Sequence, residues 1–230
     1  MRAEGGLRMM RSLIAFSLVF AIVSFVSAQA PGAGQKPDPR ALTLRGNRFK
    51  PLTYDEMNAA QKKMIDNLLA GPRGGAEGPF NVLLRSPEMG DLAGTFGAAT
   101  RFNTSMPRKL NELAIILVGR HWTSQFEWAA HHRAALQAGL SPAICDAIAE
   151  GKRPQSMAKD EEVVYNFVTE LLNTTQMSDA TFNATKATFG ERGIVDLVGV
   201  MGWYHTVSML LNVDQYPLPD GQKPELKLLK

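Results

Sequence analysis

Three side chains able to bind or transfer protons lie close together in the segment SQFEWAAHH, residues 124–132. Ser124, Glu127 and His131 are spaced i, i+3 and i+7, and at 3.6 residues per turn this spacing places them on one face of a helix. A carboxylate beside an imidazole is suited to proton transfer, because it orients the ring and raises its basicity. The segment therefore predicts a general acid/base site.

A fourth candidate, Glu112, lies 12 residues before Ser124 in the apolar segment NELAIILVG. A carboxylate in an apolar segment needs a partner or a cavity. If the two segments form an antiparallel pair of helices, Glu112 approaches the face that carries Glu127 and His131. We therefore expect Glu112, Glu127 and His131 to be catalytic.

Two other interpretations of these residues stay open. Glu127 and His131 form an i,i+4 pair, which on an exposed helix contributes only ~0.2–0.5 kcal/mol and needs no function. Burial distinguishes the two cases, since a functional set lines a pocket and a surface pair faces solvent. Together with His121 the same residues offer metal ligands, but neither an H-E-x-x-H motif nor a pair of E-x-x-H motifs is present, so we expect no metal.

The rest of the chain predicts an all-α fold. Apolar residues recur with helical spacing between proline and glycine breaks, and no Asn-Gly or Asp-Gly hairpin separates alternating runs. The first helix is expected to begin at Thr53, which with Glu56 forms a capping-box pattern. The expected helices span residues 53–71, 86–102, 106–122, 124–139, 141–151, 158–173, 178–190 and 190–212.

The N-terminal segment is typical of a secretory signal peptide. Three arginines precede the apolar run SLIAFSLVFAIVSFVSA, which ends in small residues before Gln29. This pattern predicts a signal peptide over residues 1–28 and an exported, periplasmic or secreted protein. An uncleaved membrane anchor is the alternative, since the run is near the ~18 residues at which spanning helices begin. No other segment is expected to span a bilayer.

Composition divides the remaining chain into three parts. Residues 29–50 are rich in proline and glycine, as in a flexible linker, and order is expected from Leu52. Residues 51–215 are expected to form a single helical domain, and residues 216–230, with three prolines, an extended arm. Without residues 1–28 the chain is nearly neutral and has no basic stripe, so neither nucleic acid nor a membrane is expected as a partner.

Several separated segments resemble one known family. The run NELAIILVGRHWTSQFEWAAHHRAALQAGLS resembles the signature helix pair of the carboxymuconolactone decarboxylase / alkylhydroperoxidase D-like family. The segments GPFNVLLRSPEMGDL and YHTVSMLLNVDQYPLP resemble flanking parts of its decarboxylase branch, so that the similarity covers roughly residues 52–219. The resemblance implies an alkylhydroperoxidase D-like helical bundle that assembles as a homo-oligomer, a trimer or a hexamer.

The chain departs from the peroxidase branch of that family at both thiols. That branch has a glutamate, a C-x-x-C pair and a histidine, which fall here on Glu112, Ser124, Glu127 and His131. Thiol peroxidation needs sulfur at the two central positions. The only cysteine, Cys145, lies elsewhere, beside Ile144 and Ile148, and is expected to be a buried structural thiol.

Without the two thiols, the resemblance implies acid/base chemistry at the remaining positions, with no cofactor. His131 would be the general acid/base, Glu127 would orient its ring, and Glu112 would hold a water or share the proton. Ser124, Arg120 and His121 would bind the substrate, with Arg120 pairing with a carboxylate. The expected function is carbon–carbon lyase chemistry on a small carboxylated or lactone substrate. The alternative is an exported binding or assembly protein that keeps the fold without catalysis.

Overall fold

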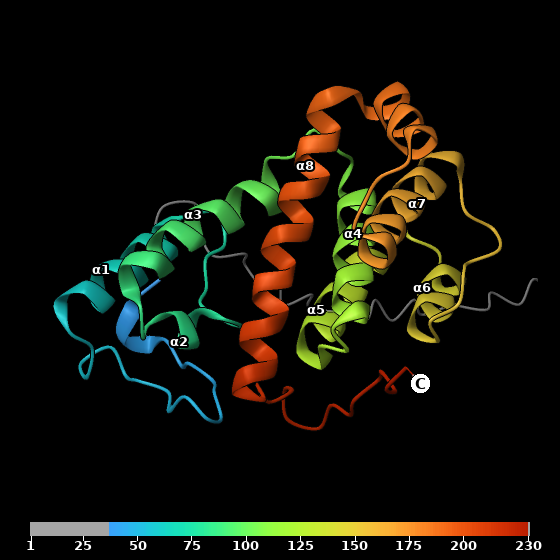
Figure 1. The fold of residues 1–230 in the computed structure, drawn as a ribbon. Coiled ribbons are helices and arrows are strands. Elements are labelled where there is room, and N and C mark those ends of the chain that lie inside the picture. Colours follow the sequence, from blue (N-terminus) through green and yellow to red (C-terminus); the bar gives the residue numbers. More distant parts are fainter. Residues whose placement is uncertain (1–36, 230) are drawn as a thin grey trace, which may run out of the picture. The chain divides into compact units, whose positions relative to one another are not determined.

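A computed structural model describes residues 37–229, and these residues are all-α, with helices and no strand (Figure 1). The expected signal peptide, residues 1–28, lies outside the described residues. A short 3-10 helix, η1, precedes eight α-helices. The elements are η1 (Pro39–Ala41), α1 (Ala59–Ala70), α2 (Phe80–Leu83), α3 (Pro87–Phe102), α4 (Arg108–His121), α5 (Gln125–Gln137), α6 (Pro142–Ala149), α7 (Lys159–Thr174) and α8 (Asp179–Asp214).

Most helix starts agree with the sequence prediction, but α1 begins later than expected and α2 lies in a segment where no helix was expected. Helices α3 and α6 each begin at a proline that follows a serine, as expected from the fixed backbone angle of proline. Helix α1 begins later than Thr53, because Asn58 and Gln61 cap each other's backbone amides there. The Thr53 amide and hydroxyl bond instead to the Glu56 carboxylate and close a separate turn.

Helix α8 runs between the α1–α3 pair and the group formed by α4 and α7 (Figure 1). Its backbone leaves helical geometry at Gly190, where φ is 70°, and this is the break expected between residues 178–190 and 190–212. Contrary to the sequence expectation, α8 is long and apolar enough to cross a membrane. Of its apolar window, 44% is buried inside the bundle.

The segment before Leu52 is not a free linker over its described part. The buried Asp214 carboxylate, at the end of α8, accepts hydrogen bonds from the backbone amides of Asn47 and Phe49 at 3.2 and 2.8 Å. Leu44 is also buried in the core. Residues 44–49 are therefore held to the helical unit by a carboxylate that is far away in the sequence.

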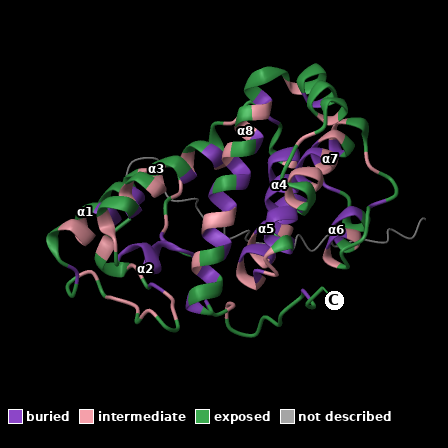
Figure 2. Ribbon diagram, in the orientation of Figure 1, coloured by how far each residue is buried: buried purple, intermediate pink, exposed green. Residues whose placement is uncertain are grey.

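Helices α4 and α5 form the hairpin that the candidate residues require. Every residue of α4 from Leu110 to Arg120 is buried, so this helix is enclosed on all sides (Figure 2). A turn of three residues, with Thr123 in the left-handed region at φ 48°, connects it to α5. Such a short connection makes the two helices antiparallel neighbours.

The C-terminal segment lies along α5. Residues 217–229 form no helix, and Leu226 is buried. The Glu225 carboxylate accepts a hydrogen bond from Trp128 Nε1 at 2.8 Å, and the Leu226 carbonyl accepts one from Gln125 Nε2 at 2.7 Å. The extended arm is thus attached by side chains of the helix that carries His131.

The contact between α3 and α8 depends on the lack of a side chain at Gly97. A Cβ at this position would lie 2.6 Å from the indole of Trp203, a rigid ring that is itself buried. We expect Gly97→Ala to lower the free energy of unfolding by about 1–3 kcal/mol, the usual cost of overpacking. Gly202→Ala, on α8, is the control, because its Cβ meets nothing within 4 Å.

Urea unfolding of the two variants measures this difference. Gly202→Ala should be neutral or slightly stabilising, since alanine favours a helix more than glycine does. Equal stability of the two variants would show that the helices separate without cost to admit a methyl group at Gly97.

Candidate active site

The structure brings Glu112, Glu127 and His131 together. His131 Nδ1 lies 2.6 Å from Glu112 Oε2, across the α4–α5 hairpin, and His131 Nε2 lies 3.0 Å from Glu127 Oε1, one turn away on α5. All three side chains are at most 5% exposed. An i,i+4 pair on a solvated helix face would be largely exposed, so this arrangement is a buried one.

The two carboxylates determine the charge of the ring. Burial by itself lowers the pKa of His131, but the negative charge of Glu127 and the contacts with both carboxylates outweigh it and raise the pKa to about 9. His131 is therefore an imidazolium at neutral pH. Its Nε2 contact with Glu127 is close but poorly aligned, so that Glu127 Oε1 has no well-directed donor among the described residues.

Glu127 and His131 line a pocket of about 250 Å³. Glu112 lies on the opposite side of the ring, in a neighbouring hollow that shares Arg101 and Arg108 with this pocket. The pocket, called here the acid/base pocket, combines the acid/base pair with cationic and aromatic side chains. Those used in the argument below are Arg73, Arg101, Arg108, Arg133, Glu77 and Tyr204.

The arginines make the acid/base pocket suited to an anion. Four guanidinium groups line it, against the two carboxylates of Glu77 and Glu127. Arg108 Nε also lies 3.9 Å from Glu112 Oε1, one turn along α4. A guanidinium presents donors in a planar fork that fits a carboxylate, so these residues can hold a carboxylated molecule beside His131.

Tyr204, on α8, supplies a neutral hydrogen-bond donor. Its ring meets the His131 ring edge to face, with centroids 4.9 Å apart, and its hydroxyl is buried with no partner among the described residues. Burial, followed by the negative charge of Glu127, raises the pKa of this phenol. The hydroxyl therefore stays protonated at neutral pH and can donate to a molecule in the pocket.

The three residues expected to bind substrate lie away from this pocket. Arg120 Nη2 donates to the Lys227 carbonyl at 2.7 Å, and His121 is exposed beside the ring of His205. Ser124 is fully buried and lines a different hollow, together with Leu226 and Leu228 of the C-terminal arm. Ser124 and His131 are seven residues apart on α5, or about 10 Å along the axis, which separates their surroundings.

Sequence reasoning missed the arginines and Tyr204. Only Arg108 could have been linked to the site from the sequence, because it lies four residues before Glu112 on the same helix. Tyr204 is adjacent to His205, whose Nδ1 accepts a hydrogen bond from Trp122 Nε1 at 2.6 Å. Arg73 comes from a glycine-rich loop whose pattern indicates a turn and no function.

Among residues 37–229, no group of three or more histidine, cysteine, aspartate or glutamate side chains is placed to hold a metal ion. No protein-family model matches the chain, and no curated protein matches it.

Proposed function

We propose that this protein is an acid/base enzyme that removes a carboxyl group from a small carboxylated or lactone substrate, a carbon–carbon lyase. One observation carries the proposal: a buried histidine held between two carboxylates in a pocket lined by arginines. Groups whose pKa values are shifted by burial and by specific partners are concentrated at active sites. The resemblance of residues 52–219 to the decarboxylase branch supports the same reaction class.

The residues of the pocket can divide the reaction between them. Arg101, Arg108 and Arg133 bind a substrate carboxylate, and Tyr204 donates to the lactone carbonyl oxygen, where negative charge develops. The bond to the departing carboxylate breaks, carbon dioxide leaves, and the electron pair passes into the conjugated carbonyl. His131 then protonates the resulting carbanion through Nε2, and solvent restores its proton.

The two glutamates have different roles in this scheme. Glu112 accepts from Nδ1 and so fixes the orientation of the ring and stabilises its positive charge. Glu127 lines the pocket, and its negative charge keeps Nε2 of His131 protonated until the substrate takes that proton. We propose no thiol chemistry, because the single cysteine, Cys145, is buried in α6 and burial raises its pKa to about 11.

The direct test is turnover of γ-carboxymuconolactone by the mature protein, followed by release of carbon dioxide. A second assay with peroxide and a dithiol tests the peroxidase alternative. Decarboxylation without peroxidase activity is the expected result. If the protein turns over neither substrate but binds a small carboxylate in this pocket, it is a binding protein that keeps the fold without catalysis.

We also propose that the protein forms a homo-oligomer. Large apolar side chains are exposed on α3 and α8, two helices that pack against each other. Such surfaces are typical of subunit interfaces. The exposed residues are Met89, Leu92, Phe96 and Phe102 on α3, and Phe182, Val195, Val198, Met209 and Val213 on α8.

We expect light scattering to give the mass of a trimer or a hexamer, and Leu92→Glu to lower that mass. Leu92 is 75% exposed, and a charge in a subunit interface is costly when it becomes buried. Leu228→Glu is the control, since this leucine is 83% exposed but lies on the C-terminal arm. A wild-type monomer at micromolar concentration would contradict the proposal.

Export remains part of the proposal, on the pattern of residues 1–28 alone. Fractionation of cells that express the full chain should place it outside the cytoplasm, shortened by about 28 residues. A full-length product in the membrane fraction would favour the uncleaved anchor.

A further inference from the structure

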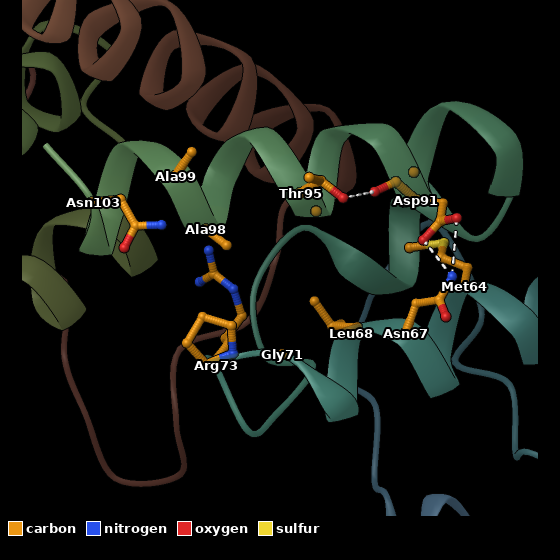
Figure 3. Close-up of a pocket in the computed structure, with 13 residues that line it drawn as sticks. Met64, Asn67, Leu68, Gly71, Arg73, Asp91, Thr95, Ala98, Ala99 and Asn103 are labelled. Atoms are coloured by element: carbon orange, nitrogen blue, oxygen red, sulfur yellow. Dashed lines mark hydrogen bonds between the residues drawn. The ribbon is translucent and has the colours of Figure 1, made fainter.

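A second cavity, of about 300 Å³, lies between α1 and α3 (Figure 3). We call it the α1–α3 pocket. Its wall is largely apolar, and polar groups are confined to a few positions. The apolar and small residues are Met64, Leu68, Gly71, Pro72, Gly90, Gly94, Ala98 and Ala99, and the polar ones are Asn67, Arg73, Asp91, Thr95 and Asn103.

The polar groups divide the α1–α3 pocket into two ends. Asp91 lies with Asn67 at one end, where the Asn67 amide donates to both carboxylate oxygens at 3.0 and 3.1 Å. Arg73 extends toward Ala98 nearer the other end (Figure 3). Leu68 and Met64 supply apolar surface along the same wall. The Asp91 carboxylate thus has a hydrogen-bond donor in Asn67, whereas Nε and Nη2 of Arg73 have no acceptor among the described residues.

Arg73 is a desolvated cation whose hydrogen-bond donors are only partly satisfied. Its Nε and Nη2 atoms are buried and have no acceptor among the described residues, and desolvation lowers its pKa. The face of the Phe80 ring, 5.0 Å from the guanidinium carbon, and the negative charge of Glu127 offset this desolvation only in part. Buried charges in proteins are normally paired, so this guanidinium is prepared for an anion.

We propose that the α1–α3 pocket binds a small monocarboxylate with an apolar body, with its carboxylate at Arg73 and its body along Leu68 and Met64. The volume is sufficient for about six carbon atoms, at the lower end of ligand pockets. A second carboxylate would approach Asp91 and be repelled, so a dicarboxylate is disfavoured. The site is separate from the acid/base chemistry, although Arg73 also lines the acid/base pocket.

The test is calorimetric titration of the mature protein with hexanoate, and with hexanol and adipate as matched probes. Hexanoate should bind about tenfold or more tightly than either probe, because hexanol lacks the charge and adipate carries a second one. Arg73→Met should reduce hexanoate binding about tenfold and leave hexanol binding unchanged. Equal affinity for hexanoate and hexanol would overturn the proposal.

Two filled-pocket variants locate the ligand. Ala98 lines the α1–α3 pocket, whereas Ala130 lines the acid/base pocket. Ala98→Phe should abolish hexanoate binding, and Ala130→Phe should leave it within about twofold of wild type. The reverse pattern would place the carboxylate beside His131 and overturn the proposal. Thr95→Trp fills the same pocket from an exposed position and replaces Ala98→Phe if thermal unfolding shows that variant to be unfolded.

Discussion

His131→Gln lowers the turnover of γ-carboxymuconolactone by about 10²–10⁴-fold, the usual contribution of a general acid/base. Glutamine retains a polar amide of similar length but neither releases nor takes up a proton at neutral pH. Its amide can still donate to one of the two carboxylates, so the fold should persist. Steady-state kinetics should show the loss mainly in kcat, because the arginines that bind the substrate carboxylate are unchanged.

The neighbouring histidine provides the matched control. His132 lies next to His131 on α5, but its Nδ1 atom contacts Glu225 Oε2 at 3.0 Å on the C-terminal arm and does not line the acid/base pocket. His132→Gln should therefore keep turnover within about twofold of wild type, as surface substitutions usually do. A His131→Gln variant as active as His132→Gln would exclude His131 as the proton donor.

The second large effect is a loss of stability at alkaline pH. The pKa of His131 rises from 6.5 to about 9 on folding, so the protonated ring stabilises the folded state fully below pH 6.5. This contribution is lost as the pH rises through about 9. At 1.36 kcal/mol per pKa unit it amounts to about 3 kcal/mol.

Urea unfolding between pH 6 and pH 9 measures this loss. The comparison is with Glu112→Gln/Glu127→Gln, in which neither carboxylate remains to hold the proton on the ring. The difference in unfolding free energy between the two proteins should shrink by about 3 kcal/mol over that interval. A difference that stays constant with pH would mean that His131 is neutral in the folded protein.

The grouping of Glu112, Glu127 and His131 was predictable from the sequence because its geometry is local. Glu127 and His131 are joined by helical spacing, and Glu112 is joined to them by one hairpin whose turn is only three residues long. The all-α fold followed from the same periodicity. Arg120 and His121 were assigned to the pocket because they flank the turn, yet a helix rotates neighbouring side chains to different faces, and these two point elsewhere.

Contacts between distant segments were not predictable in this way. Tyr204 reaches His131 only because α8 packs on α4 and α5, and Asp214 orders Asn47 across 167 positions of the chain. The start of α1 was misplaced for a local reason. Thr53 and Glu56 have capping-box chemistry, but Asn58 with Gln61 provides a second box, and the helix begins at that one.

The buried thiol of Cys145 can be used to measure how often the helical bundle opens around α6. The thiol has no exposed surface, and burial raises its pKa to about 11, so a thiol-reactive dye cannot modify it in the closed molecule at neutral pH. As the sequence holds no other cysteine, each labelled molecule has opened at least far enough to expose Cys145 on α6. At dye concentrations high enough for modification to outpace reclosing, the labelling rate gives the lifetime of the closed state, without denaturant and in the presence or absence of any small molecule.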